Sequence, residues 1–339
     1  MKLIPTLPLL FVSTLLYAAP TPPNALLVLS KSELLLKIVD PVTLQVVGQA
    51  PSGPDPHEVV TSPDGRHAYI SNYGGGAYNT ITPIDLTAQK AMPVIDLGPL
   101  RGPHGLAFAD GKLWFTAEGA KVIGRYDPAT QKVDWVLGTG QNRTHMIYVS
   151  PDMTRMVTSN VSSGTITIIE KSAGGGGGRG RGPGPGGPPQ QDWNETTVPV
   201  GNGAEGFDVT PDGKELWAAN AGDGTISVID LAGRRVTQTI DANVKGANRL
   251  KFTADGRLVF VSTLSGPDVA IFDAPTHKEL RRVPIGRGAA GILVEPGGAR
   301  VFVACTPDNY VAVIDLKSFA VTSHITAGQP DGLAWAAKR

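Results

Sequence analysis

The sequence predicts an all-β fold, a seven-bladed β-propeller built from four-stranded blades. Seven short apolar runs close on an acidic residue, and the steps between successive copies are 45, 42, 43, 60, 43 and 42 residues. The copies end at Asp40, Asp85, Asp127, Glu170, Asp230, Asp273 and Asp315. A repeat of this length indicates an array of similar supersecondary units. Short β-patterned runs separated by Asp-Gly turns are typical of propeller blades, so seven copies predict seven blades.

The fifth copy shows the order of strands that we expect within one blade. A first strand over 206–210 precedes a Pro-Asp-Gly turn, and a second strand follows over 216–220. The third strand, 225–230, ends on the acidic residue, and 235–240 forms a fourth strand with alternating Val and Thr. Asp-Gly favours the tight hairpin between the first two strands because glycine adopts the left-handed conformation easily.

The two ends of the chain predict how the ring closes. The first β-patterned run, 25–30, has the pattern of a second strand, and the last run, 332–336, has the pattern of a first strand. One blade therefore combines strands from both ends of the chain. This interleaved closure ties the ring together and removes an edge strand that would otherwise be open to aggregation.

The N-terminus predicts export from the cytoplasm. Lys2 precedes an apolar stretch from Leu3 to Leu16, and small residues follow at Ala18 and Ala19. This pattern is typical of a signal peptide and is too short for a spanning helix with stop-transfer flanks. We therefore expect residues 1–18 to be a signal peptide and the mature propeller to be periplasmic or extracellular, with no membrane span after cleavage.

The longest step between copies contains a segment of low complexity. Residues 173–191 are rich in glycine and proline and interrupt the fourth blade between its third and fourth strands. Such a composition buries too little apolar surface to offset the entropy lost on ordering, so we expect a disordered surface loop. The propeller domain would otherwise extend over residues 19–339.

The charge balance gives no reason to expect a nucleic-acid partner, and the single cysteine excludes an internal disulfide. The chain contains 30 basic and 30 acidic residues, so its balance gives no reason to expect nucleic acid as a partner. Its one cysteine, Cys305, cannot form an internal disulfide and ends an apolar strand, where a buried thiol is common. We expect a monomer that binds a small anionic molecule or a protein of the cell envelope.

The second strands resemble the repeats of a known family. They read Tyr69-Ile-Ser-Asn72, Phe115-Thr-Ala-Glu118, Val157-Thr-Ser-Asn160 and Trp217-Ala-Ala-Asn220, with two further copies ending at Thr263 and Cys305. With the Val-Ile-Asp runs, they resemble the YVTN-type β-propeller repeats, which occur in seven-bladed lactonases and in the propeller of nitrous oxide reductase. The Pro-His pairs at 56–57 and 103–104 are also similar to those of virginiamycin B lyase. That resemblance implies histidine and glutamate around a divalent metal on one face of the propeller.

A column of polar residues begins the innermost strands. It contains three histidines in consecutive blades, His57, His104 and His145, and a carboxylate stands on either side of them. The other members are Asp331, Glu205, Asn248 and Ala290. Equivalent positions in a propeller form a circle around the channel, so we expect these side chains to face a common axis.

A second column on the same face ends the second strands and includes Asn72 and Glu118. Basic residues also precede the first strands, at Arg101, Arg143, Lys245 and Arg287. Positive charge gathered around a channel with walls of low dielectric would attract an anion. We therefore expect ligand contacts from these four cations and from Asn72, Glu205, Asn248 and Asp331.

These residues support two hypotheses of different kinds. In the first, His57, His104 and His145 bind a divalent metal and leave one coordination position open. Glu118 or His145 would then act as the catalytic residue that moves a proton in a metal-assisted lyase or hydrolase reaction on an ester or lactone. In the second hypothesis the chain is a non-enzymatic binding or scaffold propeller of the cell envelope. Bound metal favours the first hypothesis, and a metal-free channel plugged by side chains favours the second.

Overall fold

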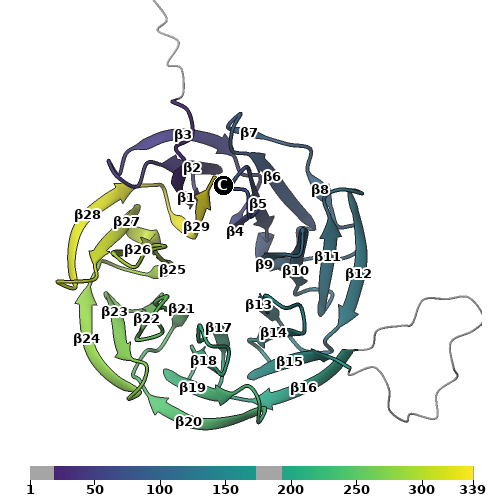
Figure 1. The fold of residues 1–339 in the computed structure, drawn as a ribbon, viewed down its shortest axis with the longest axis vertical. Helices are drawn as coiled ribbons and strands as arrows, with labels where there is room; N and C mark the ends of the chain where they lie inside the picture. The colour runs from purple at the N-terminus through teal and green to yellow at the C-terminus, as the bar shows by residue number, and fades with distance from the viewer. Residues whose placement is uncertain (1–18, 173–192, 339) are drawn as a thin grey trace, which may run out of the picture.

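The fold is a seven-bladed β-propeller, as the sequence predicts (Figure 1). A computed structural model describes residues 19–172 and 193–338. The expected signal peptide, 1–18, and the Gly/Pro-rich segment, 173–191, lie outside the described residues. Within the described part of the chain, no helix is long and apolar enough to cross a membrane.

Each blade orders its strands from the channel outward. The innermost strands are β29 (Pro330–Ala337), β4 (Pro56–Thr61), β9 (Pro103–Ala109), β13 (Thr144–Val149), β17 (Ala204–Val209), β21 (Ala247–Phe252) and β25 (Ala289–Val294). The second strands are β1 (Asn24–Ser30), β5 (His67–Asn72), β10 (Lys112–Ala117), β14 (Arg155–Asn160), β18 (Glu215–Asn220), β22 (Leu258–Thr263) and β26 (Arg300–Cys305).

The two outer layers complete the blades. The third strands are β2 (Leu35–Val39), β6 (Thr80–Asp85), β11 (Val122–Asp127), β15 (Thr165–Lys171), β19 (Thr225–Asp230), β23 (Asp268–Asp273) and β27 (Tyr310–Asp315). The outermost are β3 (Val46–Pro51), β7 (Lys90–Ala91) with β8 (Ile95–Asp96), β12 (Lys132–Gly138), β16 (Trp193–Pro199), β20 (Arg235–Asp241), β24 (Lys278–Pro284) and β28 (Ala320–Thr326). Two short 3-10 turns, η1 (Gly74–Gly76) and η2 (Thr306–Asp308), follow second strands.

The closure of the ring is the one that the chain ends predict. Strand β29 pairs with β1, in a sheet of order β29-β1-β2-β3. Leu26 lies opposite Trp335 and Val28 opposite Leu333 in this antiparallel pair. The last strand of the chain is therefore the innermost strand, next to the channel, of a blade whose other three strands come from the N-terminal end.

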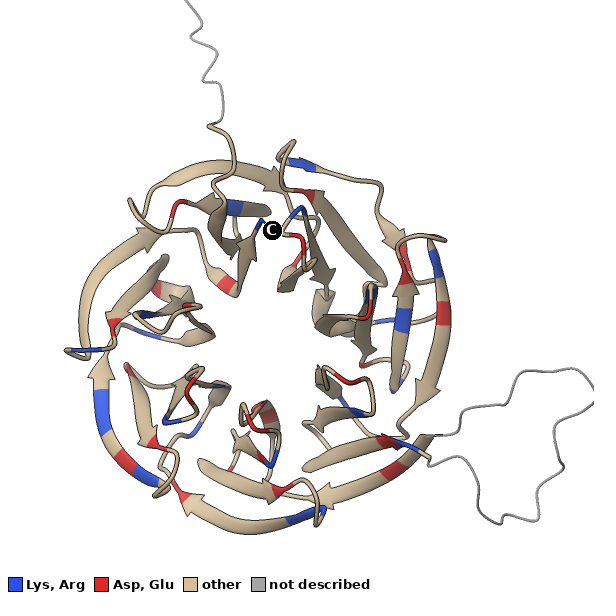
Figure 2. Ribbon diagram, viewed as in Figure 1, with Lys and Arg blue, Asp and Glu red and all other residues tan. Residues whose placement is uncertain are grey.

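The acidic residue of the repeat caps the turn after the third strand in six blades, whereas Glu170 of blade 4 accepts hydrogen bonds from Arg155 and Arg234. The Asp85 carboxylate accepts hydrogen bonds from the Thr87 and Ala88 backbone N–H groups at 2.8 and 2.9 Å. Asp40, Asp127, Asp230, Asp273 and Asp315 accept equivalent bonds in their own blades. Figure 2 shows acidic residues recurring in this way around the ring. The repeated aspartate thus accepts hydrogen bonds from N–H groups of the turn that are not paired with another strand.

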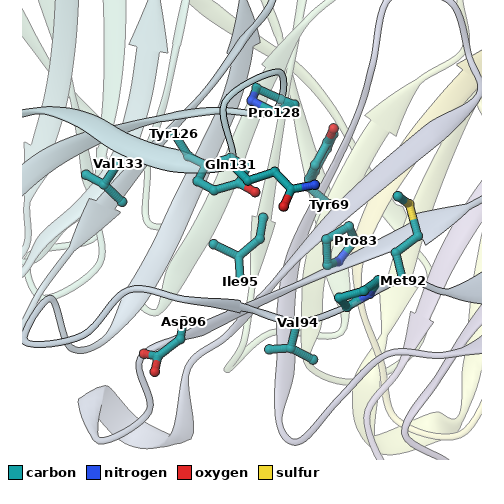
Figure 3. Close-up of a pocket in the computed structure, with 11 residues that line it drawn as sticks. Tyr69, Pro83, Met92, Val94, Ile95, Asp96, Tyr126, Pro128, Gln131 and Val133 are labelled. Atoms are coloured by element: carbon teal, nitrogen blue, oxygen red, sulfur yellow. The ribbon is translucent and has the colours of Figure 1, made fainter.

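Blade 2 departs from the expected four continuous strands. Its outermost strand is split into β7 and β8, which pair separately with β6, whereas the other six blades have outer strands of six or seven residues. Pro93 lies in the gap, and Pro83 in the facing strand offers no N–H to pair with. The gap opens a surface pocket of about 260 Å³ lined by Tyr69, Met92 and Ile95 among others (Figure 3). None of the expected site residues lines it.

The core consists of the contacts between neighbouring blades. The middle strands are almost wholly buried, and Trp114 and Trp217 in β10 and β18 have 1% and 0% exposure. Cys305 is a buried free thiol at the end of β26, as expected, and burial raises its pKa to about 12. This packing leaves polar residues mainly at strand ends and along the channel.

Candidate functional site

A repeated β-bulge builds the ring of polar residues. Every innermost strand shows a register shift against its second strand, immediately after the first paired residue. In β4, for example, Pro56 pairs with Asn72 and the next pair is Val59 with Ile70, so His57 and Glu58 lie in the bulge. The first residue of each bulge is the column that the sequence identifies. Bulges redirect side chains, which accounts for this column lying at one depth around the axis.

The second residue of each bulge alternates between glycine and a large side chain around most of the ring. Blades 3, 5, 7 and 1 have Gly105, Gly206, Gly291 and Gly332, and blades 2, 4 and 6 have Glu58, Met146 and Arg249. A Cβ atom on Gly105 would lie 2.5 Å from the backbone oxygen of His145. Glycine at this position therefore lets the inner strands of neighbouring blades approach closely.

Hydroxyl groups of the second strands fix the ring residues in place. The Thr116 hydroxyl accepts a hydrogen bond from the Gly105 backbone N–H at 2.9 Å and donates one to the His145 carbonyl at 2.6 Å. Ser159 and Ser262 make the same pair of contacts between their own bulge and the next blade. Ser159 and Ser262 are at the third position of the four-residue repeat, which therefore links one blade to the ring residue of the next. The strand register puts Thr116 at the same position, because Ala117, and not Glu118, pairs with the first residue of its inner strand. Glu118 thus comes one residue after the second strand, not at its end as the repeat predicts.

The three ring histidines contact one another, as the shared column predicts. The ring centroids of His57 and His104 are 4.6 Å apart, and those of His104 and His145 are 3.7 Å apart. Tyr73, which follows β5, covers this row, with its ring centroid 5.0 Å from that of His57 and 5.1 Å from that of His104. The channel mouth therefore holds four stacked or edge-on rings.

His104 is the central member and has no polar partner among the described residues. Its side chain is 0% exposed, and neither Nδ1 nor Nε2 makes a hydrogen bond there. Burial holds its pKa well below the ordinary histidine value, and the neighbouring His145 lowers it further. A buried polar group without a partner is costly, so a neutral imidazole at this position is suited to bind a metal ion or a ligand.

His145 lies between two carboxylates. Its Nδ1 donates a hydrogen bond to Glu118 Oε1, and its Nε2 is 3.2 Å from Glu205 Oε1. Burial alone would lower the pKa of His145, but Glu205 and Glu118 outweigh it and raise that pKa above its ordinary value. Conversely, burial would raise the pKa of Glu205, but His145 and nearby arginines lower it to about 2. In the metal-free site these two carboxylates therefore favour the imidazolium form of His145.

Glu118 is held by further donors. The Tyr73 hydroxyl donates to Glu118 Oε2 at 2.5 Å, and Arg143 Nε is 3.5 Å from the same oxygen. Burial would raise the pKa of Glu118, but the hydrogen bond from His145 and these neighbours lower it overall. Burial and the Glu118 carboxylate together raise the pKa of Tyr73, so its hydroxyl stays a donor. Glu118 is thus a fixed, ionised carboxylate beside two imidazoles.

The structure assembles a potential metal-binding group that differs from the predicted trio in one residue. His104, Glu118 and His145 are all buried, and one ligand atom from each lies within 4.8 Å of the others. His57 is engaged elsewhere, because Lys31 Nζ donates to its Nδ1 at 2.6 Å. Asp331 also lies 3.4 Å from that nitrogen. Glu118, which the sequence assigns a catalytic role, thus stands where the prediction places His57.

The predicted polar residues Asn72, Asn248 and Asp331 do not belong to the potential metal-binding group. Asn72 is buried and bonds the Ser52 carbonyl and two hydroxyls of β6, so its amide holds strands together. Asn248 is buried, and Asp331 pairs with Lys31 at 3.2 Å.

The four rim cations differ in whether they reach the histidine and glutamate cluster. Arg143 contacts Glu118 and lies 3.8 Å from Glu205. Arg101, Lys245 and Arg287 are exposed, and Arg287 pairs with Asp308 instead. Of these four cations only Arg143 touches the histidine and glutamate cluster in the described structure, and the ligand roles of the others stay predictions.

Sequence reasoning misses several residues of the site. Tyr73 and Lys31 come one residue after the end of their second strands, beyond the column that contains Asn72 and Ser30. Lys31 also pairs with Asp55 at 2.9 Å, and the other oxygen of Asp55 accepts the Gly74 N–H. A comparison of residues directly after the second strands would have shown Tyr73 beside three glycines, a sequence found in blade 2 alone.

Comparison with known proteins identifies the architecture. No protein-family profile matches the chain, and no curated protein sequence matches it. A functionally unknown protein from Desulfotomaculum acetoxidans DSM 771 is 14% identical with a TM-score of 0.73, covering 93% of this chain and 100% of that one. A Bacteroides fragilis NCTC 9343 protein, provisionally assigned as a 6-phosphogluconolactonase, is 14% identical with a TM-score of 0.73, covering 92% and 97%. The likeness is one of fold.

A third solved structure is also similar in fold. Hydrazine synthase of Kuenenia stuttgartiensis is 17% identical with a TM-score of 0.65, covering 83% of this chain and 89% of that one. The chain therefore shares its propeller fold with these proteins. Membership of the YVTN-type family stays a prediction from the repeats, and the function has to be argued from the site itself.

Proposed function

We propose that this chain binds a divalent metal ion at His104, His145 and Glu118 and uses it in hydrolase or lyase chemistry on a small carbonyl compound. His104 is the observation that carries the proposal, because it is fully buried, and in the described structure both of its ring nitrogens are unpartnered. Two imidazoles and one carboxylate suit a borderline metal such as Zn²⁺ and leave a coordination position open for water or substrate.

The charge of the channel mouth supports a cation there. The ion-pair network around the three ring histidines contains the carboxylates Glu118, Glu205, Asp331 and Asp55 and the cations Lys31 and Arg143. Four negative and two positive groups leave an excess of two negative charges when the histidines are neutral, and of one while His145 carries its second proton. Such a site attracts a divalent cation more strongly than a free anion.

The residues around the proposed metal have separate roles. A bound metal would polarise a substrate carbonyl or acidify a water molecule. Arg143, whose side chain is 43% exposed, lies on the open side of Glu118 and is placed to bind a substrate carboxylate. His57 accepts from Lys31 at Nδ1, so in its neutral form its proton is on Nε2, where it can be donated to a substrate oxygen. Glu118 and His145 would then serve as ligands, in place of the proton transfer that the sequence suggests.

Metal analysis of the mature, untagged protein tests the proposal. We expect about one ion per chain, and we expect His104→Asn to lose it while the circular dichroism spectrum and melting curve keep the wild-type shape. His67→Asn is the matched control, because His67 is a histidine outside the site and should leave the metal content unchanged. A wild-type protein that takes up no Zn²⁺, Mn²⁺ or Ca²⁺ on titration would contradict the proposal and favour the non-enzymatic envelope propeller.

We also propose that the mature chain acts outside the cytoplasm, on the basis of residues 1–18. N-terminal sequencing of the protein recovered from a periplasmic fraction tests this directly. We expect the mature chain to begin within one or two residues of Ala19. Recovery of the intact N-terminus from the cytoplasm alone would refute export.

A further inference from the structure

The central channel contains a cavity further along the inner strands from the histidine ring. Its volume is about 370 Å³, within the lower part of the range of small-molecule sites. Its walls come from the inner strands, from the second residue of the bulge onward, and none of the ring histidines lines it. The apolar part of the lining includes Val60, Phe108, Met146, Leu293, Leu333 and Trp335. We call this cavity the lower chamber.

The end of the lower chamber next to the histidine column contains an ion pair across the channel. Glu58 belongs to β4 in blade 2 and Arg249 to β21 in blade 6, and both are the second residues of their bulges. Arg249 Nε donates to Glu58 Oε1 at 3.1 Å, and Nη2 donates to the same oxygen. Both residues line the chamber, and Arg249 is only 5% exposed. The pair therefore forms a polar roof over an apolar cavity.

The charged groups of the chamber are paired but keep unused donors. Arg249 and Lys251 are the cations of its lining, and Glu58 in the lining pairs with Arg249. Asp208, which does not line the chamber, pairs with Lys251. The bonds of Arg249 to Glu58 and to the Asn248 carbonyl use three of its five N–H groups. Lys251 makes one long contact, 3.3 Å to Asp208, and its side chain is 38% exposed. Donors are therefore left for one further acceptor group.

We propose that the lower chamber binds an amphipathic monocarboxylate. Its carboxylate would lie against Lys251 and Arg249, and its aliphatic or aromatic body would contact the apolar walls. The N–H groups of Arg249 and Lys251 that make no contact in the described structure match one carboxylate, whereas a second charge on the ligand would have to be desolvated without a partner. The apolar walls favour a hydrocarbon body over a sugar or a free inorganic anion. None of the proposed metal ligands lines this chamber, so the two sites can be tested separately.

Calorimetric titration with octanoate, and with 1-octanol as its uncharged match, tests the proposal on the mature chain. We expect octanoate to bind one to one and octanol to bind about tenfold or more weakly, since it lacks the charge-assisted hydrogen bonds. Lys251→Met should lower the octanoate affinity by about tenfold and leave the octanol affinity unchanged. Lys214→Met is the matched control, because Lys214 is an exposed lysine paired with a carboxylate outside the chamber, and it should change neither affinity.

Four outcomes would overturn the proposal. Three of them are no heat with octanoate, equal affinity for octanol and octanoate, and an octanoate affinity that Lys251→Met leaves unchanged. His104→Asn locates the ligand, since octanoate affinity unchanged in that variant supports the lower chamber. Loss of octanoate binding in His104→Asn would place the carboxylate at the channel mouth and contradict the chamber. Melting curves of each variant, compared with the wild type, show that the titrated protein is folded.

Discussion

The ion pair between Glu58 and Arg249 gives a quantitative test of how the channel is built. The two residues are 191 positions apart and belong to blades on opposite sides of the ring. Arg249→Met removes the guanidinium and keeps a long apolar side chain of similar reach. The replacement leaves Glu58 at the roof of an apolar chamber with its main partner gone.

The burial of both partners sets the expected magnitude. The side chain of Arg249 is 6% exposed and that of Glu58 is 15% exposed, so water screens the remaining carboxylate poorly. Breaking a buried pair by removing one partner costs about 3 to 5 kcal/mol. For a chain of this length, with an unfolding entropy of roughly 2 cal/mol/K per residue, this corresponds to a decrease in melting temperature of roughly 4 to 8 °C.

A double-mutant cycle measures the pair itself. Thermal and urea unfolding of wild type, Arg249→Met, Glu58→Gln and the double variant give the coupling free energy. We expect the double variant to be more stable than the sum of the single changes by about 1 kcal/mol or more, because it leaves no unpaired charge. Single variants within about 0.5 kcal/mol of wild type, or strictly additive effects, would show that the two side chains do not pair across the channel.

Three further changes test other parts of the structure. Deleting residues 330–339 removes β29 from its pairing with β1, and we expect loss of the cooperative melting transition, in contrast to the small change expected from trimming a frayed end. Thr116→Val keeps the side-chain shape but leaves the Gly105 N–H and the His145 carbonyl without their shared partner, which should cost about 1 to 3 kcal/mol in urea unfolding; an unchanged midpoint would refute the clamp. In the metal-free protein the pKa of His145 is raised, so its ion pairs stabilise the fold fully below the ordinary histidine pKa and lose this effect as pH rises through the raised value. The stability difference between wild type and His145→Gln should therefore shrink from pH 6 to pH 9, and a difference that grows would contradict this charge assignment.

The repeat is the reason that the fold could be predicted from the sequence. The aspartate that ends the third strand caps a turn in six of the seven blades, and the strand order follows from its position. The same alignment places His57, His104 and His145 at one depth, because equivalent positions in all blades face the same axis. A periodic pattern thus determines both the blades and the ring.

The partners of these residues could not be predicted in the same way. The bulge puts two successive residues of each inner strand near the channel, whereas strict alternation would direct Glu58 and Arg249 away from it. Their pairing depends on two blades facing each other across the ring, which repeat spacing does not specify. Glu118 replaces His57 in the metal-binding group because Lys31, from blade 1, engages His57.

The most direct test of the account is a crystal structure of the untagged protein grown with Zn²⁺, with anomalous scattering recorded at the zinc edge. We expect one strong anomalous peak about 2.0 to 2.2 Å from a ring nitrogen of His104, a ring nitrogen of His145 and an oxygen of Glu118. His145 would then have lost its proton, and its hydrogen bond to Glu118 would be replaced by the metal. A channel mouth with no anomalous peak, in which ordered water molecules bond both nitrogens of His104, would contradict the metal site.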